Sequence, residues 1–358
     1  MAITAAMVKE LREMTGAGMM DCKKALTETN GDMEAAVDVL KKSGAAKMEK
    51  KASRIAAEGI ARVAANDTVA VVVEVNSETD FVAKNETFQE FVQVVADNAL
   101  ASGLEGGANG EDIEAVLDMN GLKELLVEKT ATIGEKLSVR RFAKVTGDCV
   151  ASYLHAGGKI GVLVAGTGAS DVKEALTNVA MQIAAMNPQY ISRTEISADE
   201  LAKIREITVD SALNDPASLP KPIQNELYTK VETEKLFSEE DLAILAEKKN
   251  DKYLYNFLSK EAIAKLAELA LAGKAAYVEN KIFAGLVEGR ISKQLKEICL
   301  LDQTYVKAED GKQTVAAYLA SVNKDLAIAK FVRFEVGEGM EKKNEDFAAE
   351  VAAQMANA

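Results

Sequence analysis

The sequence has no tryptophan, a single histidine, three cysteines and four prolines among 358 residues, and only 5% of its residues are aromatic. Cys22, Cys149 and Cys299 lie far apart, and the chain has neither a CxxC pair nor a second histidine. Because a zinc site needs several nitrogen or sulfur ligands at suitable spacing, we predict no metal centre. An odd number of isolated cysteines is instead typical of free thiols in a reducing compartment.

Long hydrophobic runs are also missing from the sequence. No segment approaches the roughly 18 consecutive apolar residues of a membrane-spanning helix. The first residues reach Lys9 and Glu10 too early for a secretory signal, and they do not form an arginine-rich presequence. We therefore expect a cytoplasmic protein.

Residues that carry out covalent catalysis are scarce as well. His155 is the only imidazole, and no serine lies in a GxSxG motif. The glycine-rich run Ala165–Ser170 (AGTGAS) follows a predicted strand but lacks the spacing of phosphate-binding loops. The net charge of −13 argues against a general nucleic-acid binder, although residues 1–54 carry +2 and the rest carries −15. We predict a protein that is not an enzyme and that binds no cofactor.

The 48% of hydrophobic residues are mainly alanine, leucine and valine, which is typical of a helix-rich protein. Three short helices are predicted at the N-terminus, over Ala5–Met14, over Met20–Thr29 and after Asp32, which fits an N-cap. The run Thr15–Gly18 separates the first two. In size and pattern this module resembles a ubiquitin-associated domain, and the basic stretch Lys41–Arg54 is predicted to be a linker.

A duplicated unit follows, and each copy consists of two strands, a helix and a closing strand. The elements of the first copy are 59–65, 69–75, a helix from about Glu86, and 138–145. The elements of the second copy are 149–155, 160–165, 172–186 and 330–336. The closing strands share an alternation of arginine and phenylalanine with the period of a β-strand. We predict an α+β fold in which each copy is a small antiparallel sheet backed by helices.

A long insertion separates the helix of the second copy from its closing strand. Helical patterns over 199–213 and 277–300 predict an antiparallel helical arm, and 239–249 and 259–272 enlarge its tip. The stripe expected to be buried on the returning helix is Val278, Ile282, Leu286, Ile291, Leu295 and Ile298. The predicted domains are 1–54 (helical module and linker), 55–146 (first core subdomain), 147–187 with 301–338 (second core subdomain), 188–300 (arm) and 339–358 (C-terminal helical module).

The segment Ser77–Phe88 (SETDFVAKNETF) connects a strand to a helix and places Asp80 beside Phe81. A phenylalanine on a polar loop is uncommon because little at a loop tip can cover it. Either Phe81 folds back onto its own sheet, or it contacts another molecule. At the corresponding place the second copy has GTGASDV, without an aromatic residue. This difference favours a role for Phe81 outside its own core.

Two long motifs in this sequence resemble the signatures of the translation elongation factor Ts family. They are EVNSETDFVAK (Glu74–Lys84) and LREMTGAGMMDCKKAL (Leu11–Leu26). Near the C-terminus, FVRFEVGEG and DFAAEVAA are similar to the same family. The resemblance is weakest over Asp215–Ala275, where this chain looks longer than the family's usual form. It implies a nucleotide exchange factor whose partner is elongation factor Tu, a GTPase. Self-association through the enlarged arm is left open.

The resemblance also implies which residues contact the partner. Asp80 and Phe81 correspond to a wedge near the magnesium site of the GTPase, and Thr79, Val82 and Lys84 support it. The further contacts that it implies are Met19, Met20, Lys23, Ile133, Gly134, His155, Val306, Phe347, Val351 and Met355. Purely structural interpretations remain open for some of these residues: a helix end at Ile133 and Gly134, a polar strand end at His155, and core positions for the two methionines.

Two rival functions are compatible with parts of the sequence. The N-terminal module alone would suit a ubiquitin-like or helical-peptide adapter, which predicts that residues 1–54 suffice for binding. A small-molecule enzyme using the glycine-rich run at 165–170 predicts nucleotide binding by the isolated chain. An exchange factor predicts neither result.

Overall fold

We describe a computed structural model of the chain, which defines residues 3–341. The chain divides into two compact units, residues 1–187 with 305–358 and residues 188–304. Helices together with small antiparallel sheets confirm the predicted α+β class. Within residues 3–341, no helix combines the length and the apolar character needed to cross a membrane.

The first unit begins with three helices around a small core. They are α1 (Ala5–Thr15), α2 (Met19–Glu28) and α3 (Met33–Lys51). As expected, the Asp32 side chain caps α3 by accepting a hydrogen bond from the Ala35 N–H at 3.0 Å. Leu11, Cys22 and Leu26 are fully buried where the helices meet.

The basic stretch that we predicted to be a linker is helical as far as Lys51. The extension of α3 lies against α7 (Leu122–Ile133). Gly44 lies at this contact, where an added Cβ would come within 3.2 Å of the Val127 side chain. Sequence periodicity misses this extension because tertiary packing, rather than an amphipathic pattern, stabilises it.

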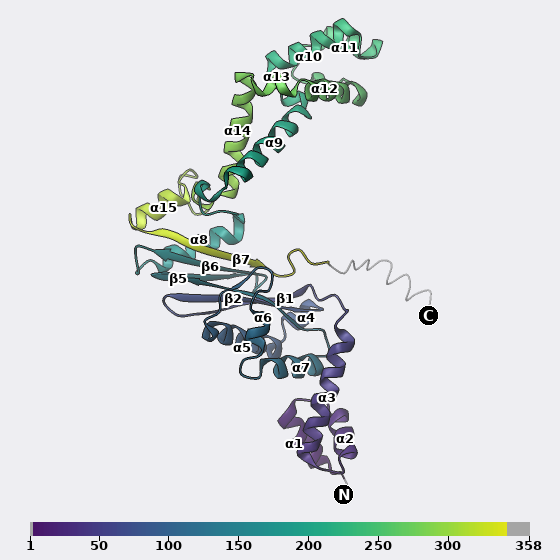
Figure 1. Ribbon diagram of the computed structural model, residues 1–358, viewed down its shortest axis with the longest axis vertical. Helices are drawn as coiled ribbons and strands as arrows, with labels where there is room; N and C mark the ends of the chain where they lie inside the picture. Colours follow the sequence, from purple (N-terminus) through teal and green to yellow (C-terminus); the bar gives the residue numbers. More distant parts are fainter. Residues whose placement is uncertain (1–2, 342–358) are drawn as a thin grey trace. The chain divides into compact units, whose positions relative to one another are not determined.

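Two antiparallel sheets form the centre of the first unit (Figure 1). The first has the order β1-β2-β4-β3, with bounds Glu58–Ala65, Val69–Ser77, Ser138–Thr146 and Gly106–Gly107. The second has the order β5-β6-β7, with bounds Cys149–His155, Ile160–Thr167 and Ala327–Glu335. In each sheet a hairpin pairs through its second strand with a later closing strand. The sequence predicted these strands and antiparallel sheets, but neither the order of pairing nor β3.

The two sheets share an apolar core formed by side chains such as Val72, Leu163 and Phe334. The opposite face of β2, including Val71 and Val73, packs against helices. Those on the first sheet are α5 (Glu86–Ser102), α6 (Ile113–Leu117) and α7, and those near the second sheet are α8 (Lys173–Met186) and α15 (Val315–Val322). The core therefore has four layers in the order helix, sheet, sheet, helix. Alternate side chains of β2 point to opposite faces, and both faces are covered, one by helices and the other by the second sheet.

The second unit is entirely helical in its regular structure and has its own core. Its helices are α9 (Ala198–Leu213), α10 (Lys221–Glu234), α11 (Glu239–Lys248), α12 (Lys260–Ala272), α13 (Lys274–Val278) and α14 (Lys281–Ile298). Ion pairs Arg205–Glu288 and Asp210–Lys274 join the outgoing and returning segments in antiparallel order. The sequence did not predict α10, because Pro220 and Pro222 looked like helix terminators. Both prolines lie at its start, where a missing N–H costs little.

The predicted apolar stripe of the returning helix is only partly correct. Ile291 and Leu295 are buried, whereas Val278 and Ile282 are 44% and 51% exposed. The Asn280 side chain accepts hydrogen bonds from the Ile282 and Phe283 N–H groups and starts a new helix. This start resets the helical phase, so the buried row of α14 is Phe283, Val287, Ile291 and Leu295.

Candidate partner-binding site

The connection after β2 contains a one-turn helix that the sequence did not predict, α4 (Asp80–Ala83). Thr79 caps it, because its Oγ1 accepts a hydrogen bond from the Val82 N–H at 3.3 Å. Asn85 caps the following α5 in the same way, through the Phe88 N–H at 3.2 Å. A helix of four residues is too short to leave a periodic signal in a sequence. We call residues 78–84 the Asp80–Phe81 turn.

Phe81 points away from the core and is 80% exposed. Its neighbours do the opposite: Ala83 is buried, and Val82 packs against the core under the first sheet. Of the two interpretations left open by the sequence, the structure therefore rules out the one in which Phe81 folds back onto its own sheet.

Asp80 and Lys84 form an ion pair beside the exposed ring. The Lys84 Nζ lies 2.7 Å from Asp80 Oδ2 and 6.0 Å from the centroid of the Phe81 ring. The hydrogen bond from Lys84 lowers the pKa of the Asp80 carboxyl group below its usual value. The turn thus presents an apolar ring and an ionised carboxylate together.

The turn is fastened to the chain just after α7. Glu135 accepts hydrogen bonds from both the N–H and the hydroxyl of Thr79, at 3.0 and 2.7 Å. In return, the Glu78 side chain accepts a hydrogen bond from the Lys136 N–H at 2.6 Å. These reciprocal bonds bring the predicted contacts Ile133 and Gly134 next to the turn. Ile133 is half-buried, and exposed Gly134 ends α7 with φ of 86°, so it serves as a glycine C-cap.

His155 lies at the end of the two sheets that also carries the Asp80–Phe81 turn. It is the last residue of β5 and is exposed, and its Nδ1 lies 3.1 Å from the Tyr153 hydroxyl. The hairpin that follows contacts β1, since Gly158 accepts a hydrogen bond from the Ala61 N–H at 2.7 Å and Lys159 pairs with Glu58. Because Glu58 is opposite Ser77 in the sheet, this hairpin and the Asp80–Phe81 turn share one end of the core.

The remaining predicted contacts lie elsewhere. On α2, Met19 is 48% exposed, Met20 is 76% exposed and Lys23 is exposed, so the two methionines are not core residues. Val306 is 48% exposed, and its N–H donates to Gln182 Oε1 at 2.8 Å. The predicted C-terminal stripe of Phe347, Val351 and Met355 falls outside the described residues.

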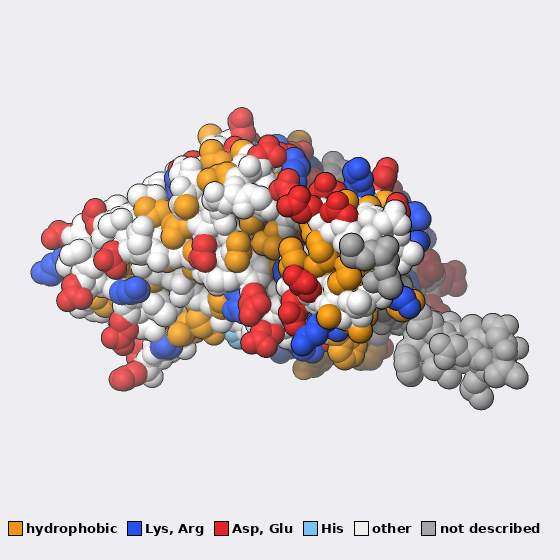
Figure 2. Space-filling model, turned by 90° about the horizontal axis from the view of Figure 1, so that it is seen from below, with side chains coloured by type: hydrophobic (Ala, Val, Ile, Leu, Met, Phe, Trp, Pro, Cys, Tyr) orange, Lys and Arg blue, Asp and Glu red, His pale blue; other side chains and the backbone are white. Residues whose placement is uncertain are grey.

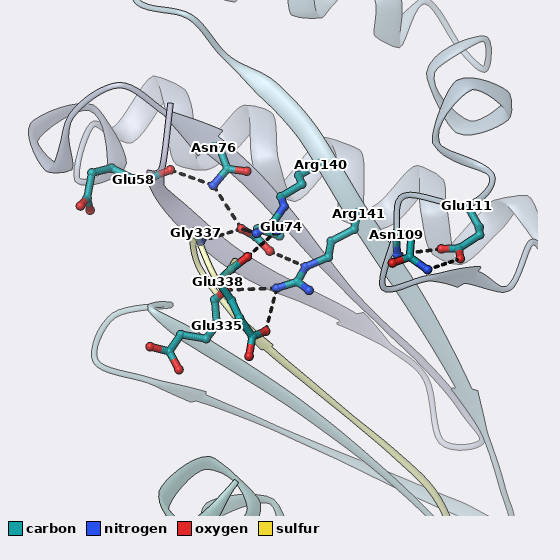
Figure 3. A network of polar contacts seen from close by, with 10 residues as sticks. All are labelled: Glu58, Glu74, Asn76, Asn109, Glu111, Arg140, Arg141, Glu335, Gly337 and Glu338. Atoms are coloured by element: carbon teal, nitrogen blue, oxygen red, sulfur yellow. Dashed lines mark hydrogen bonds and ion pairs between the residues drawn. The ribbon is translucent and has the colours of Figure 1, made fainter. Parts of the chain in front are cut away.

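The sequence analysis did not single out Glu74, although it lies inside the EVNSETDFVAK motif. Its carboxylate is fully buried and is surrounded by the network drawn in Figure 3. An acidic residue in the otherwise apolar run VAVVVEV was the signal available for finding it. Glu135 carried no comparable signal, because its role depends on a contact across 56 residues of sequence.

The exposed side chains are of several chemical types. Figure 2 shows one face, on which hydrophobic side chains lie among both acidic and basic ones. In the part of the chain that the structure defines, no group of three or more histidine, cysteine, aspartate or glutamate side chains could hold a metal ion. In the glycine-rich run at 165–170, the Gly168 N–H donates to Asp148 Oδ2 at 2.8 Å, so it is used within the protein.

Comparison with known proteins identifies a family and a relative that this chain resembles. The sequence model of the family described as Elongation factor TS matches residues 78–338. The chain is also similar to Elongation factor Ts of Clostridioides difficile (strain 630), with 45% identity over 366 residues and 99% of each chain covered. The chain therefore belongs to the elongation factor Ts family of translation elongation factors.

Proposed function

We propose that this protein is a guanine-nucleotide exchange factor for elongation factor Tu, a GTPase, and that it speeds GDP release by disturbing the magnesium and phosphate site. The observation that carries the proposal is the Asp80–Phe81 turn. Its phenylalanine is 80% exposed, while Glu135 and Lys136 hold the turn to α7. An exposed ring on a braced support is suited to insertion into another protein.

The mechanism requires differential binding and no covalent chemistry by this chain. The factor must bind the nucleotide-free GTPase more tightly than the GDP-bound form. By reciprocity, an incoming nucleotide weakens the complex and releases the factor unchanged. Phe81 supplies apolar bulk that separates elements near the bound magnesium ion. Asp80, which Lys84 keeps ionised, competes for polar groups that otherwise hold the ion or the phosphates.

The same proposal assigns further contacts with the GTPase. Thr79, Val82 and Lys84 brace the turn, and Ile133, Gly134 and His155 contact the partner from the same end of the core. The N-terminal helices, in the role of a ubiquitin-associated-like module, contribute Met19, Met20 and Lys23. The remaining assigned contacts are Val306, Phe347, Val351 and Met355. We place the protein in the cytoplasm, where translation elongation occurs in bacteria.

The test is stopped-flow release of fluorescent GDP from purified elongation factor Tu. Phe81→Ala should slow release at saturating factor by roughly 10- to 100-fold, because burying a phenylalanine side chain is worth about 1.5–3 kcal/mol. Phe257→Ala is a matched control, since Phe257 is 47% exposed in the second unit and also lies beside a lysine, Lys248, at 4.6 Å. A folded Phe81→Ala protein with an unaltered release rate would overturn the proposal.

A further inference from the structure

Glu74 places a carboxylate in a row of β2 whose preceding residues are apolar. Ala70 and Val72 precede it on the face of β2 that packs between the sheets, and all three residues are 0% exposed. The carboxylate accepts four hydrogen bonds (Figure 3). The donors are Arg140 Nη1 at 2.9 Å, Arg141 Nε at 2.6 Å, Asn76 Nδ2 at 3.1 Å and the Gly337 N–H at 2.9 Å. We call Glu74 and its partners, together with Glu338, the Glu74 network.

A β-bulge makes this geometry available. Glu74 is opposite Arg141 and Val75 is opposite Val139, so Arg140 is an extra residue in β4. Successive side chains of a regular strand point to opposite faces, and a bulge breaks that alternation. Two adjacent arginines can therefore reach one carboxylate.

The network also holds the end of β7 and the turn after it. The Arg141 guanidinium lies 4.2 Å from the centroid of the Phe334 ring, and its Nη2 donates to the Glu335 carbonyl at 3.1 Å. Arg140 Nη2 donates to the Glu338 carbonyl at 2.5 Å. Gly337 is confined by its surroundings, since an added Cβ would clash with the Ala57 carbonyl.

Two buried polar residues, Asn76 and Ser77, lie on β2 between Glu74 and the Asp80–Phe81 turn. The Asn76 Nδ2 that binds Glu74 also donates to the Glu58 carbonyl at 3.0 Å. Ser77 is fully buried, and its hydroxyl donates to the Thr79 carbonyl at 3.0 Å. The strand that carries the turn is therefore fixed in register and direction up to the residue that caps α4.

The second copy indicates that the fold does not need this network. It has a bulge at the corresponding place, between Ala165 and Gly166 of β6. Ala165, opposite Lys330, occupies the position of Glu74, and Ala329 occupies that of Arg140. Buried ion pairs add little stability over packed apolar side chains. The hydrogen bonds of a buried polar network instead restrict the positions of the groups that it joins.

We propose that Glu74 is a positioning residue: through Asn76, Ser77 and Thr79 it fixes the Asp80–Phe81 turn relative to the end of β7. The inference rests on the proposed exchange function. It assigns the buried ion pair a role in how fast GDP is released, beyond its role in stability.

The experiment measures GDP release from elongation factor Tu against factor concentration. It separates the maximal rate from the concentration that gives half of that rate. Glu74→Gln, which keeps the shape but removes the charge, should lower the maximal rate about tenfold, within the range that a small misplacement costs. Asp241→Asn is the matched control, because Asp241 is also a buried, multiply hydrogen-bonded carboxylate but belongs to the second unit. It should reduce thermal stability and leave the maximal rate unchanged.

A double variant distinguishes positioning from general destabilisation. If Glu74 acts through the turn, Glu74→Gln combined with Phe81→Ala should be no slower than Phe81→Ala alone. Additive losses in the maximal rate, or an unaffected maximal rate in folded Glu74→Gln, would overturn the inference. If Phe81→Ala itself has no effect, the proposed function fails instead.

A milder variant covers the case in which Glu74→Gln does not fold. Arg140 is the outer arginine, with 24% of its side chain exposed, and Arg140→Met leaves the Glu74–Arg141 pair intact. We expect a loss of about threefold in the maximal rate, smaller than for Glu74→Gln. An unchanged maximal rate in Arg140→Met would also overturn the inference.

Discussion

The two copies of the α+β unit make the same strand-to-helix connection in different ways. After β2 the chain forms α4, fastens it to Glu135 and exposes Phe81. After β6 the run Gly168–Val172 leads to α8 without a comparable helix or an aromatic residue. Both connections follow the second strand of a hairpin, and in both copies the pairing of that strand with the closing strand shifts register just before the connection. The extra features of the first connection are thus not demanded by the fold, which is why we attribute them to binding.

The largest difference between the copies should appear at the bulges. Glu74→Ala removes the closest carboxylate of buried Arg141, which then keeps only the longer pair with Glu338 at 3.3 Å, and should lower the free energy of unfolding by about 3 kcal/mol. In the second copy, Lys330 lies at the position of Arg141. Lys330→Ala removes an exposed side chain and should change the free energy of unfolding by less than about 0.5 kcal/mol. Urea denaturation of both variants measures this contrast. Similar losses in the two copies would mean that the Glu74 network is not specifically important for stability.

A smaller, local effect is expected where each connection is fastened. Glu135→Ala removes the acceptor of two hydrogen bonds from Thr79 and should destabilise the turn by about 1.5–3 kcal/mol. Asp148→Ala removes one bond, to the Gly168 N–H, and should cost about 1 kcal/mol. Amide hydrogen exchange at Thr79 and Gly168 reports these openings separately. Equal protection at Thr79 with and without Glu135 would contradict the bracing that we describe.

Phe81→Ala should have the smallest effect on stability. The side chain is 80% exposed, so the free energy of unfolding should change by no more than about 0.5 kcal/mol. Phe88→Ala, at a fully buried ring in the next helix, should instead cost about 3–5 kcal/mol. Thermal unfolding of the two variants tests whether Phe81 is dispensable for the fold. A large loss of stability in Phe81→Ala would refute this expectation.

The Asp80–Lys84 pair allows a test by pH alone. Because Lys84 lowers the pKa of Asp80 in the folded protein, the pair's stabilisation is present above the ordinary value of 3.8 and is lost as pH falls through the lowered value. An NMR titration should place the Asp80 midpoint below 3.8, and Lys84→Ala should move it upward. A midpoint that does not respond to Lys84→Ala would show that the ion pair does not form in solution.

Strong periodic patterns predicted much of the fold. The β-branched run before Ser77, which is typical of a strand buried on both faces, and the alternation in the closing strands predicted the main strands of both sheets. Short or capped elements were harder to predict. The one-turn helix α4 has too few residues for a period, and α10 was concealed by the prolines at its start.

The candidate site was only partly visible in the sequence. The EVNSETDFVAK motif drew attention to Asp80 and Phe81, but it could not say whether the ring was covered. The bracing by Glu135 joins residues 56 apart, and the bond from Gly337 to Glu74 joins residues 263 apart. Contacts of this kind leave no pattern in a single sequence, because they depend on how distant segments pack.

Local elements of this protein follow from its residue pattern: the alternation of apolar residues, the helix caps and the repeated order of strands. The sequence also specifies which chemical groups are available at the turn. Two features depend on long-range packing: Phe81 is exposed while Val82 and Ala83 are covered, and a bulge directs two arginines to Glu74. The reason is that exposure and pairing are set by the surfaces that distant segments bring together, whereas periodicity reflects only the surroundings that neighbouring residues share.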